Sequence, residues 1–119
     1  MKNFNIQRGD LLQVRLPDPQ GHSSVQAGTR PCLVIGNNAQ NKFSPTILVA
    51  PLTTKNKKPL PTHVSIKADC VNLSADSTIL LEQVMTVDKS RVEHYIGCWT
   101  EEIEKEVEKC LAISLGRTA

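Results

Sequence analysis

The sequence predicts one mainly β domain of the α+β type, a small and strongly bent barrel or sandwich that ends in a single α-helix. Short apolar and β-branched runs recur at close spacing between Gly, Pro, Asn and Ser residues, as in small β folds. Only the last part of the chain has helical spacing, and strands do not alternate with helices, which argues against a doubly wound sheet. Because 119 residues suffice to bury one core, residues 1–119 are interpreted as a single domain.

Five stretches are predicted to be strands from their apolar content and alternation. Residues 32–35 and 47–50 are continuous apolar runs, which are typical of strands buried on both faces. Near the start of the chain, Leu12, Val14 and Leu16 alternate with polar residues, so one face of that strand is expected to be buried. The predicted strands are residues 11–16, 30–35, 46–52, 62–67 and 78–87.

Residues 100–115 form the one predicted helix of substantial length. Thr100 is a suitable N-cap, and Glu101 and Glu102 favour the positive end of the helix dipole. Apolar residues then recur at helical spacing and define one buried face, and Gly116 provides a stop. This helix is expected to pack on the sheet.

Two loops flank the two central strands. Residues 17–29 are rich in Pro, Gly and Ser and contain His22, whereas residues 53–61 contain three lysines and no acid. Lysines in such a loop can discourage edge-to-edge pairing of sheets, or they can bind the phosphates of a nucleic acid. Because the two roles are compatible, three residues are candidates for phosphate binding: Lys55, Lys57 and Lys58.

The net charge of +2 conceals an uneven distribution of charge. Residues 1–67 contain nine Lys or Arg and two Asp, a balance of +7. Residues 68–119 contain five Lys or Arg and ten Asp or Glu, a balance of −5. The first part therefore favours an anionic partner, unless folding interleaves the two parts and averages the field.

Several kinds of protein and site are disfavoured by what the chain lacks. No apolar run approaches the roughly 18 residues of a membrane span, and residues 1–10 lack the apolar segment of a signal peptide. The four cysteines form no C-x-x-C pair and the three histidines are scattered, so we expect free thiols in a reducing cytoplasm, no metal site and no cofactor. Gly-x-Ser-x-Gly and the phosphate-binding loops of nucleotide enzymes are also missing.

Arg30 begins one central strand, and Thr53 directly follows the other. If these two strands are antiparallel neighbours, Arg30 and Thr53 come to the same end of the sheet. A guanidinium and a hydroxyl at that position could bind one phosphate, provided that neither side chain is buried. Such groups suit RNA cleavage by the substrate's own 2′-hydroxyl, because that reaction needs in-line positioning and charge stabilisation and no enzyme nucleophile. The bases must be unstacked, which favours single-stranded RNA.

Several short motifs follow one another in order over nearly the whole chain. They include Arg8-Gly9-Asp10, Gln26-Ala27-Gly28-Thr29-Arg30-Pro31, Asn41-Lys42-Phe43-Ser44-Pro45-Thr46, Val49-Ala50-Pro51-Leu52-Thr53, Leu60-Pro61-Thr62-His63-Val64 and Leu80-Leu81-Glu82-Gln83. Together these motifs closely resemble the MazF/PemK family of toxins. The resemblance implies an SH3-like β-barrel with a C-terminal helix, and a homodimer. It also implies a metal-independent, sequence-specific endoribonuclease that cleaves single-stranded mRNA and is inhibited by a MazE-type antitoxin.

The resemblance also implies roles for single residues. Arg30 matches the catalytic arginine of the family and Thr53 its catalytic threonine, and the implied products carry a 2′,3′-cyclic phosphate and a 5′-hydroxyl. Four polar residues fall where the family contacts RNA: Ser24, Gln26, Asn37 and Gln83. The acceptor of the 2′-hydroxyl proton is left open between His22, Glu82 and solvent.

Two residues depart from the family pattern. Val25 stands where many members have Glu, and Met85 stands where many have an Arg or Lys that can help bind the phosphate. Without that basic residue, Arg30 would supply more of the charge stabilisation. Two other functions are therefore kept in view: a gyrase-targeting toxin of the CcdB type, which shares the barrel architecture, and a non-catalytic SH3-like module that binds RNA or protein.

Overall fold

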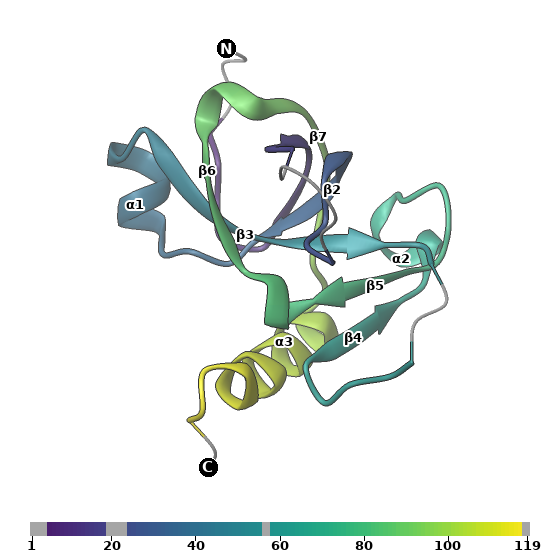
Figure 1. The fold of residues 1–119 in the computed structure, drawn as a ribbon. Helices are drawn as coiled ribbons and strands as arrows, with labels where there is room; N and C mark the ends of the chain where they lie inside the picture. The colour runs from purple at the N-terminus through teal and green to yellow at the C-terminus, as the bar shows by residue number, and fades with distance from the viewer. Residues whose placement is uncertain (1–4, 19–23, 56–57, 118–119) are drawn as a thin grey trace.

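The chain forms a mainly antiparallel β structure with a C-terminal helix (Figure 1), seen in a computed structural model that describes residues 5–18, 24–55 and 58–117. The strands are β1 (Asp10–Leu16), β2 (Gly28–Val34), β3 (Thr46–Thr53), β4 (His63–Ile66), β5 (Ser77–Leu80), β6 (Met85–Asp88) and β7 (Val92–Cys98). The helices are α1 (Asn38–Phe43), α2 (Ala68–Val71) and α3 (Glu101–Ser114), and the 3-10 turns are η1 (Leu81–Gln83) and η2 (Lys89–Arg91).

Strand β3 lies at the centre of the sheet, whose order is β4-β5-β3-β2-β1-β7 with β6 also paired to β3. One edge of β3 pairs with β2, from Val49 to Pro51. The other edge pairs first with β6, from Thr46 to Val49, and then with β5, at Leu52 and Thr53. Because β5 and β6 share one edge of β3, the turn η1 between them lies where the sheet changes direction.

The described pairings do not close the barrel that the sequence predicts. Strands β4 and β7 end the order, and within the described residues each pairs with a single neighbour. The mainly β class and the C-terminal helix are confirmed. The ladder between β1 and β7 also contains two register shifts, near Leu11 and near Gln13, which are typical of a strongly bent sheet edge.

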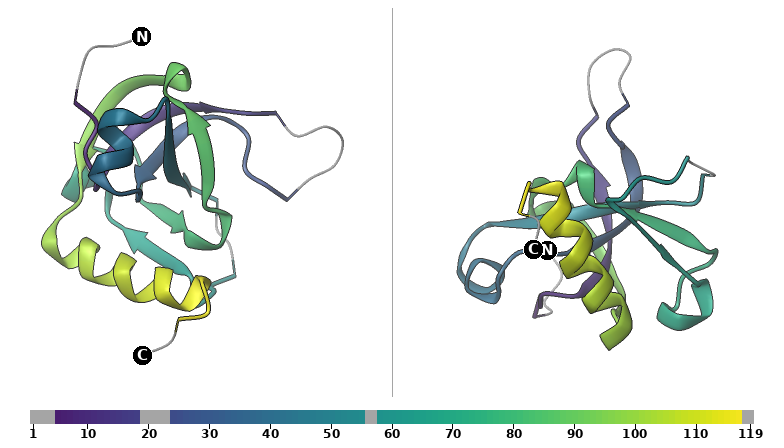
Figure 2. Two further views of the ribbon diagram at one scale, coloured as in Figure 1. Left: turned by 90° about the vertical axis from the view of Figure 1, so that its left-hand side faces the viewer. Right: turned by 90° about the horizontal axis from the view of Figure 1, so that it is seen from below.

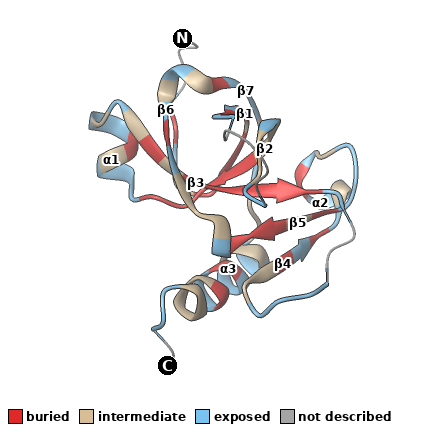
Figure 3. Cartoon of the chain, viewed as in Figure 1, coloured by how far each residue is buried: buried red, intermediate tan, exposed pale blue. Residues whose placement is uncertain are grey.

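Two clusters of buried side chains lie on opposite faces of the central strands. In Figure 3 most of β3 and β5 is coloured as buried. Leu33 belongs to the cluster that includes the α3 residues Val107 and Cys110, whereas its neighbour Val34 belongs to the other cluster. Alternate side chains of β1, β2 and β3 therefore enter different clusters. The prediction that residues 32–35 and 47–50 are buried on both faces is almost fully confirmed, with Leu48 alone only half-buried.

Helix α3 lies along one side of the sheet, next to β4 and η1 (Figure 2). The predicted N-cap is confirmed, because Thr100 Oγ1 accepts a hydrogen bond of 3.2 Å from the backbone N–H of Ile103. Near the other end of the helix, Ser114 Oγ donates to the carbonyl oxygen of Leu81 at 2.7 Å. The helix therefore holds η1 by a direct hydrogen bond as well as by apolar packing.

Several elements differ from the sequence-based prediction. The predicted strand over residues 78–87 is two strands, β5 and β6, separated by η1. The sequence analysis did not predict β7 or the short helices α1 and α2. The remaining predicted strands and the helix agree with the structure to within two residues at each end.

Candidate functional site

Arg30 lies near the start of β2 and is held by two backbone carbonyl groups. Its Nε donates to the oxygen of Ala27 at 3.0 Å, and its Nη1 donates to the oxygen of Leu52 at 3.3 Å. The side chain is half-buried. A guanidinium has five N–H donors, so these two bonds fix its orientation and leave others for an anion.

The predicted proximity of Arg30 to the end of β3 is confirmed, since Leu52 immediately precedes Thr53. Strands β2 and β3 are antiparallel, with Cys32 opposite Pro51, and this register brings the start of β2 to the end of β3. The adjacency therefore follows from the strand pairing itself. Within the described residues, Arg30 and Thr53 make no direct hydrogen bond to each other.

The condition that both side chains reach solvent freely is not met by Thr53, which is only 3% exposed. Thr53 lies opposite Thr78 of β5 in the ladder. Its Oγ1 accepts a hydrogen bond of 3.2 Å from the backbone N–H of Lys55. A hydroxyl that accepts one such bond still has its own proton to donate, so Thr53 retains one polar function.

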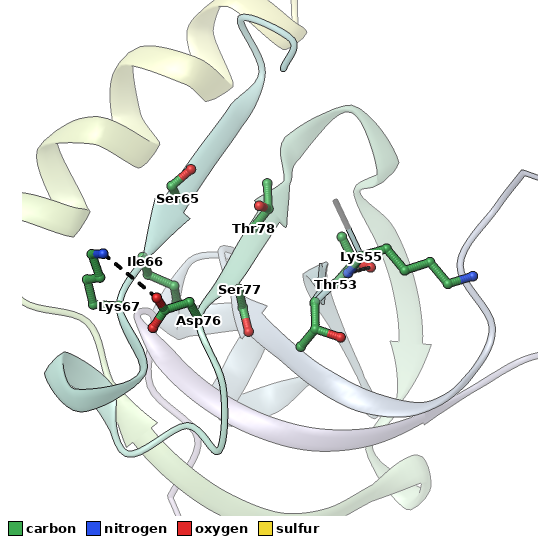
Figure 4. Close-up of a pocket in the computed structure, with 9 residues that line it drawn as sticks. Thr53, Lys55, Ser65, Ile66, Lys67, Asp76, Ser77 and Thr78 are labelled. Carbon is green, nitrogen blue, oxygen red and sulfur yellow. Dashed lines mark hydrogen bonds and ion pairs between the residues drawn. The ribbon is translucent and has the colours of Figure 1, made fainter. Parts of the chain in front are cut away.

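Thr53 also lines a pocket of about 220 Å³ between the ends of β3, β4 and β5 (Figure 4). Most of its lining residues carry hydroxyl or charged groups: Thr53, Thr54, Lys55, Ser65, Ile66, Lys67, Asp76, Ser77 and Thr78. Lys67 Nζ lies 3.8 Å from an oxygen of Asp76, and Lys55 extends away from that ion pair in Figure 4. The pocket can therefore bind a polar group, although Arg30 is not part of its lining.

Gln83 connects η1 to the segment that precedes β2. Its Oε1 accepts from the backbone N–H of Gln26 at 2.8 Å, and its Nε2 donates to the carbonyl oxygen of Ser24 at 3.2 Å. Both ends of the amide are therefore engaged within the protein. Ser24 is exposed and Gln26 half-buried, and both lie shortly before Ala27, which anchors Arg30.

Asn37 lies apart from the other predicted RNA-contacting residues. It is the N-cap of α1, where its Oδ1 accepts from the backbone N–H of Gln40 at 2.8 Å. Asn37 follows the end of β2 that lies far from Arg30. The extended strand from Arg30 to Val34 already spans roughly 13 Å, and Asn37 lies beyond Val34. In Figure 1, α1 is correspondingly on the side of the sheet away from β4 and β5. The structure therefore does not bring Asn37 together with Arg30 and Thr53.

The predicted lysines are only partly described. Lys55 and Lys58 are exposed, as a role in binding an anion requires. Lys57 lies outside the described residues, as does His22. Of the predicted cationic groups near the end of β3, two can therefore be assigned to the surface.

Cys32, two residues beyond Arg30 on β2, can be excluded as a nucleophile on physical grounds. Burial raises the pKa of its thiol to about 12, although the nearby guanidinium of Arg30 acts in the opposite direction. The Sγ–H donates to the carbonyl oxygen of Arg30 at 3.7 Å. A thiol with so high a pKa stays protonated near neutral pH, and the thiolate is the nucleophilic form.

Glu82, a candidate proton acceptor, is already bound by two neighbours. Its Oε1 accepts from Thr62 Oγ1 at 3.1 Å, and its Oε2 lies 3.0 Å from His63 Nε2. Partial burial acts to raise the pKa of Glu82, but hydrogen bonds from His63 and Thr62 outweigh it, so the pKa is lower than usual. A lowered pKa makes a carboxylate a weaker base. Sequence analysis missed the His63–Glu82 contact, because these residues are distant in the chain.

Comparison with known proteins identifies the family. Residues 7–115 match the family model described as a PemK-like, MazF-like toxin of type II toxin–antitoxin systems. The chain belongs to this family. The MazF-like chain is also 42% identical over 112 residues to Endoribonuclease MazF of Staphylococcus saprophyticus, with 93% of this chain and 92% of that protein covered. The resemblance found in the sequence is therefore confirmed.

Solved structures show that this MazF-like toxin shares the fold of its relatives. MazF from Deinococcus radiodurans has a TM-score of 0.79 and 22% identity, covering 96% of this chain and 99% of that chain. A MazE–MazF structure from the same organism has a TM-score of 0.75 and 24% identity, covering 98% of this chain and all of that chain (100%). These likenesses confirm the predicted fold class.

The two departures from the family pattern have different structural settings. Val25 is 52% exposed, between Ser24 and Gln26. Met85 is half-buried, lies opposite Val49 in the β3–β6 ladder and packs against the core cluster on that face of the sheet. An uncharged side chain packed in this way cannot bind a phosphate by charge, so Met85 supplies no replacement for a basic residue.

Within residues 5–18, 24–55 and 58–117, no helix is both long and apolar enough to cross a membrane. The same described part of the chain contains no group of three or more His, Cys, Asp or Glu residues placed to hold a metal ion.

Proposed function

We propose that this MazF-like toxin is an endoribonuclease that cleaves single-stranded mRNA at specific sequences without a metal ion. The single observation that carries the proposal is the anchoring of Arg30 by the carbonyl groups of Ala27 and Leu52. Leu52 is the residue directly before Thr53, so the guanidinium is held close to the end of β3. Membership of a toxin family and the similarity to an endoribonuclease of Staphylococcus saprophyticus support the same conclusion.

In the proposed reaction the substrate 2′-oxygen attacks the adjacent phosphorus atom, and the bond from phosphorus to the 5′-oxygen breaks. The products carry a 2′,3′-cyclic phosphate and a 5′-hydroxyl, and the proton lost by the 2′-hydroxyl is balanced by one gained by the 5′-oxygen. Arg30 stabilises the charge that develops on the phosphorane oxygens. A guanidinium is permanently charged in proteins, so Arg30 acts as a fixed charge and not as a base.

Thr53 is assigned a smaller part in this reaction. Its hydroxyl proton can be donated to a non-bridging phosphate oxygen that enters the pocket beside it. Because the residue is only 3% exposed, this contact depends on how closely the phosphate approaches the end of β3. The charge of Arg30 is therefore the larger contribution.

In this reaction we assign solvent as the acceptor of the proton that leaves the 2′-hydroxyl. Glu82 has a lowered pKa and both of its oxygens are engaged, which disfavours it as a base. His22 lies outside the described residues. A reaction that relies on solvent as the base would gain most of its rate from positioning and charge stabilisation.

The proposal includes two protein partners. A MazE-type antitoxin is supported by the solved MazE–MazF structure with the same fold. A second copy of this chain, forming a homodimer, is proposed because the family resemblance implies it. The mass in solution, measured by light scattering with and without the antitoxin, tests both assemblies.

The activity is tested by incubating the purified protein with a long single-stranded RNA in the presence of EDTA and mapping the new ends. We expect discrete cuts at a short sequence, with 5′-hydroxyl ends and cyclic phosphates. Arg30→Ala serves as the control for a contaminating nuclease, since it should nearly abolish the same cuts. Intact RNA with the folded wild-type protein would overturn the proposal.

Two observations favour the second candidate, a non-catalytic module that binds RNA. Thr53 is nearly inaccessible, and Met85 supplies no charge. This alternative predicts RNA binding without cleavage in the same assay. A gyrase-targeting toxin would leave the RNA intact and inhibit DNA supercoiling, so one additional supercoiling assay separates all three functions.

A further inference from the structure

His63 has a nearly inaccessible side chain whose two ring nitrogens are both engaged. That side chain is only 7% exposed, although it lies at the start of β4, the last strand in the sheet order. Nδ1 accepts a hydrogen bond of 3.3 Å from the backbone N–H of Leu60, and Nε2 lies 3.0 Å from Oε2 of Glu82.

The contacts of His63 indicate which role each ring nitrogen has. Since Nδ1 accepts a hydrogen bond, the ring proton resides on Nε2, which then donates to the carboxylate of Glu82. The other carboxylate oxygen accepts from Thr62 Oγ1 at 3.1 Å. Backbone bonds add to this connection, since Leu81 N–H donates to the oxygen of Thr62 at 3.1 Å. The start of β4 is thus bonded to η1 through side chains and main chain together.

Turn η1 also reaches in the opposite direction, toward Arg30. Glu82 and Gln83 are consecutive residues of η1, and Gln83 binds the backbone of both Ser24 and Gln26. The next residue in the chain is Ala27, whose carbonyl oxygen anchors the guanidinium of Arg30 at 3.0 Å. A continuous series of hydrogen bonds and chain neighbours therefore runs from His63, through η1, to the anchor of Arg30.

We propose that His63 is a positioning residue, which fixes η1 by binding Glu82 and thereby fixes the segment of residues 24–27 that orients Arg30. The inference deepens the proposed function, on which its effect on RNA cleavage rests. His63 does not touch the substrate in this scheme. By fixing η1, His63 holds the amide of Gln83 where it can bind the backbone of both Ser24 and Gln26.

Two substitutions separate the two contacts of the histidine. His63→Gln places an amide N–H near the position of Nε2 and can keep the bond to Glu82, whereas His63→Asn places an acceptor near the position of Nδ1 and can keep only the bond to Leu60. If His63 merely closes the turn at Leu60, the Asn variant should behave as wild type. If it positions η1, the Gln variant should be the one that retains function.

The first measurement is hydrogen–deuterium exchange at the backbone amide of Gln26, which requires no catalysis. We expect faster exchange in His63→Asn, by about tenfold or more, and a rate close to wild type in His63→Gln. The amide of Ile103, bound by the cap residue Thr100, is the internal control, since global destabilisation would raise its exchange as well. Unchanged exchange at Gln26 in the folded Asn variant would overturn the inference.

The second measurement is the kinetics of RNA cleavage. We expect His63→Asn to lose about ten- to a hundredfold in kcat, because a small misplacement of a charge-stabilising group has effects of this size. KM should change less, and His63→Gln should restore most of kcat. His94→Asn, at an exposed histidine of β7, is the matched control. Equal losses in the Asn and Gln variants would also overturn the inference.

The two measurements separate this inference from the proposed function. If the wild-type protein cuts no RNA, the proposed function fails, and exchange at Gln26 alone decides whether His63 positions the segment. If the wild type cuts RNA and the Gln26 amide does not respond to His63→Asn, the proposed function stands and the positioning role of His63 is refuted.

Discussion

The guanidinium of Arg30 donates from Nη1 to the backbone carbonyl oxygen of Leu52 over 3.3 Å, which ties the side chain on β2 to the main chain of β3. The carbonyl belongs to the residue directly before Thr53, so the charge and the hydroxyl of the proposed site are positioned by one strand pairing. A second bond, from Nε to Ala27 at 3.0 Å, restricts rotation of the side chain. A positive charge held in this way needs little reorganisation when a phosphate binds.

Arg30→Ala is expected to reduce RNA cleavage by about a hundredfold or more, because it removes a preorganised charge. Stability should fall by only about 1 kcal/mol, the usual net value of a hydrogen bond. Initial cleavage rates and the urea midpoint of unfolding check the two parts. Arg30→Lys keeps the charge but loses the planar set of donors, so it should remain well below wild type. A full cleavage rate in the folded Ala variant would refute the assignment of Arg30.

Replacement of Lys55, Lys57 and Lys58 together by Gln is expected to weaken RNA binding and make it less dependent on salt. For each lysine that neutralises a phosphate of a single strand, the substitution should reduce the slope of log K against log salt by about 0.7. Binding measured by fluorescence anisotropy at several salt concentrations gives this slope. Lys105→Gln, an exposed lysine on α3, is the control. A slope identical to wild type would show that the three lysines do not meet phosphates.

The sequence predicted the central strands, the C-terminal helix and the approach of Arg30 to the end of β3, because each depends on local pattern and one antiparallel pairing. Strand β7 was missed since Glu93, His94 and Tyr95 are consecutive exposed residues, and such a strand lacks the alternation that identifies a half-buried one. Helix α1 was missed because it has only six residues and depends on the cap at Asn37. Its sequence therefore has the composition of a turn.

The local settings of the site residues were less predictable. The burial of Thr53 depends on which residue of β5 lies opposite, and that register is decided by long-range packing. The internal use of the Gln83 amide likewise depends on a loop that meets η1 from 57 residues away in the chain. Residue types indicated the chemistry of the site, whereas accessibility and hydrogen-bond partners required coordinates.

The four cysteines are expected to react in two groups. Cys70 and Cys98 are exposed, whereas Cys32 and Cys110 are buried. Burial raises the pKa of both buried thiols, for Cys32 to about 12, so little thiolate forms there. Alkylation of the folded protein at about pH 8 should therefore modify two thiols rapidly and leave two protected. Mass spectrometry after brief labelling counts them, and labelling in urea should reach all four. Rapid modification of Cys32 in the folded protein would contradict its burial.

Glu82 is expected to make stability depend on pH in the acid range. Its folded-state pKa is lowered, so its contribution to stability is present above the unfolded pKa of about 4.3 and is lost as pH falls through the lower folded value. Glu82→Gln should therefore lower the melting temperature at neutral pH and flatten its decline below about pH 4.3. Thermal unfolding across this range checks the sign. Glu93→Gln, which removes an exposed carboxylate, should leave the acid decline unchanged.

Thr53 provides the most direct test of whether a nearly buried hydroxyl takes part in the reaction. Thr53→Val keeps the shape of the side chain and removes the hydroxyl, so packing against β5 should survive. The N–H of Lys55 loses its acceptor but lies in an exposed residue that water can reach. If the hydroxyl donates to the phosphate, the Val variant should lose about tenfold or more in cleavage rate, as for other charge-stabilising donors, and Thr53→Ser should retain most of it. Initial rates on one RNA and the melting temperatures of both variants provide the comparison. A Val variant that cleaves at the wild-type rate would show that burial keeps the Thr53 hydroxyl out of the reaction and that Arg30 provides the charge stabilisation without it.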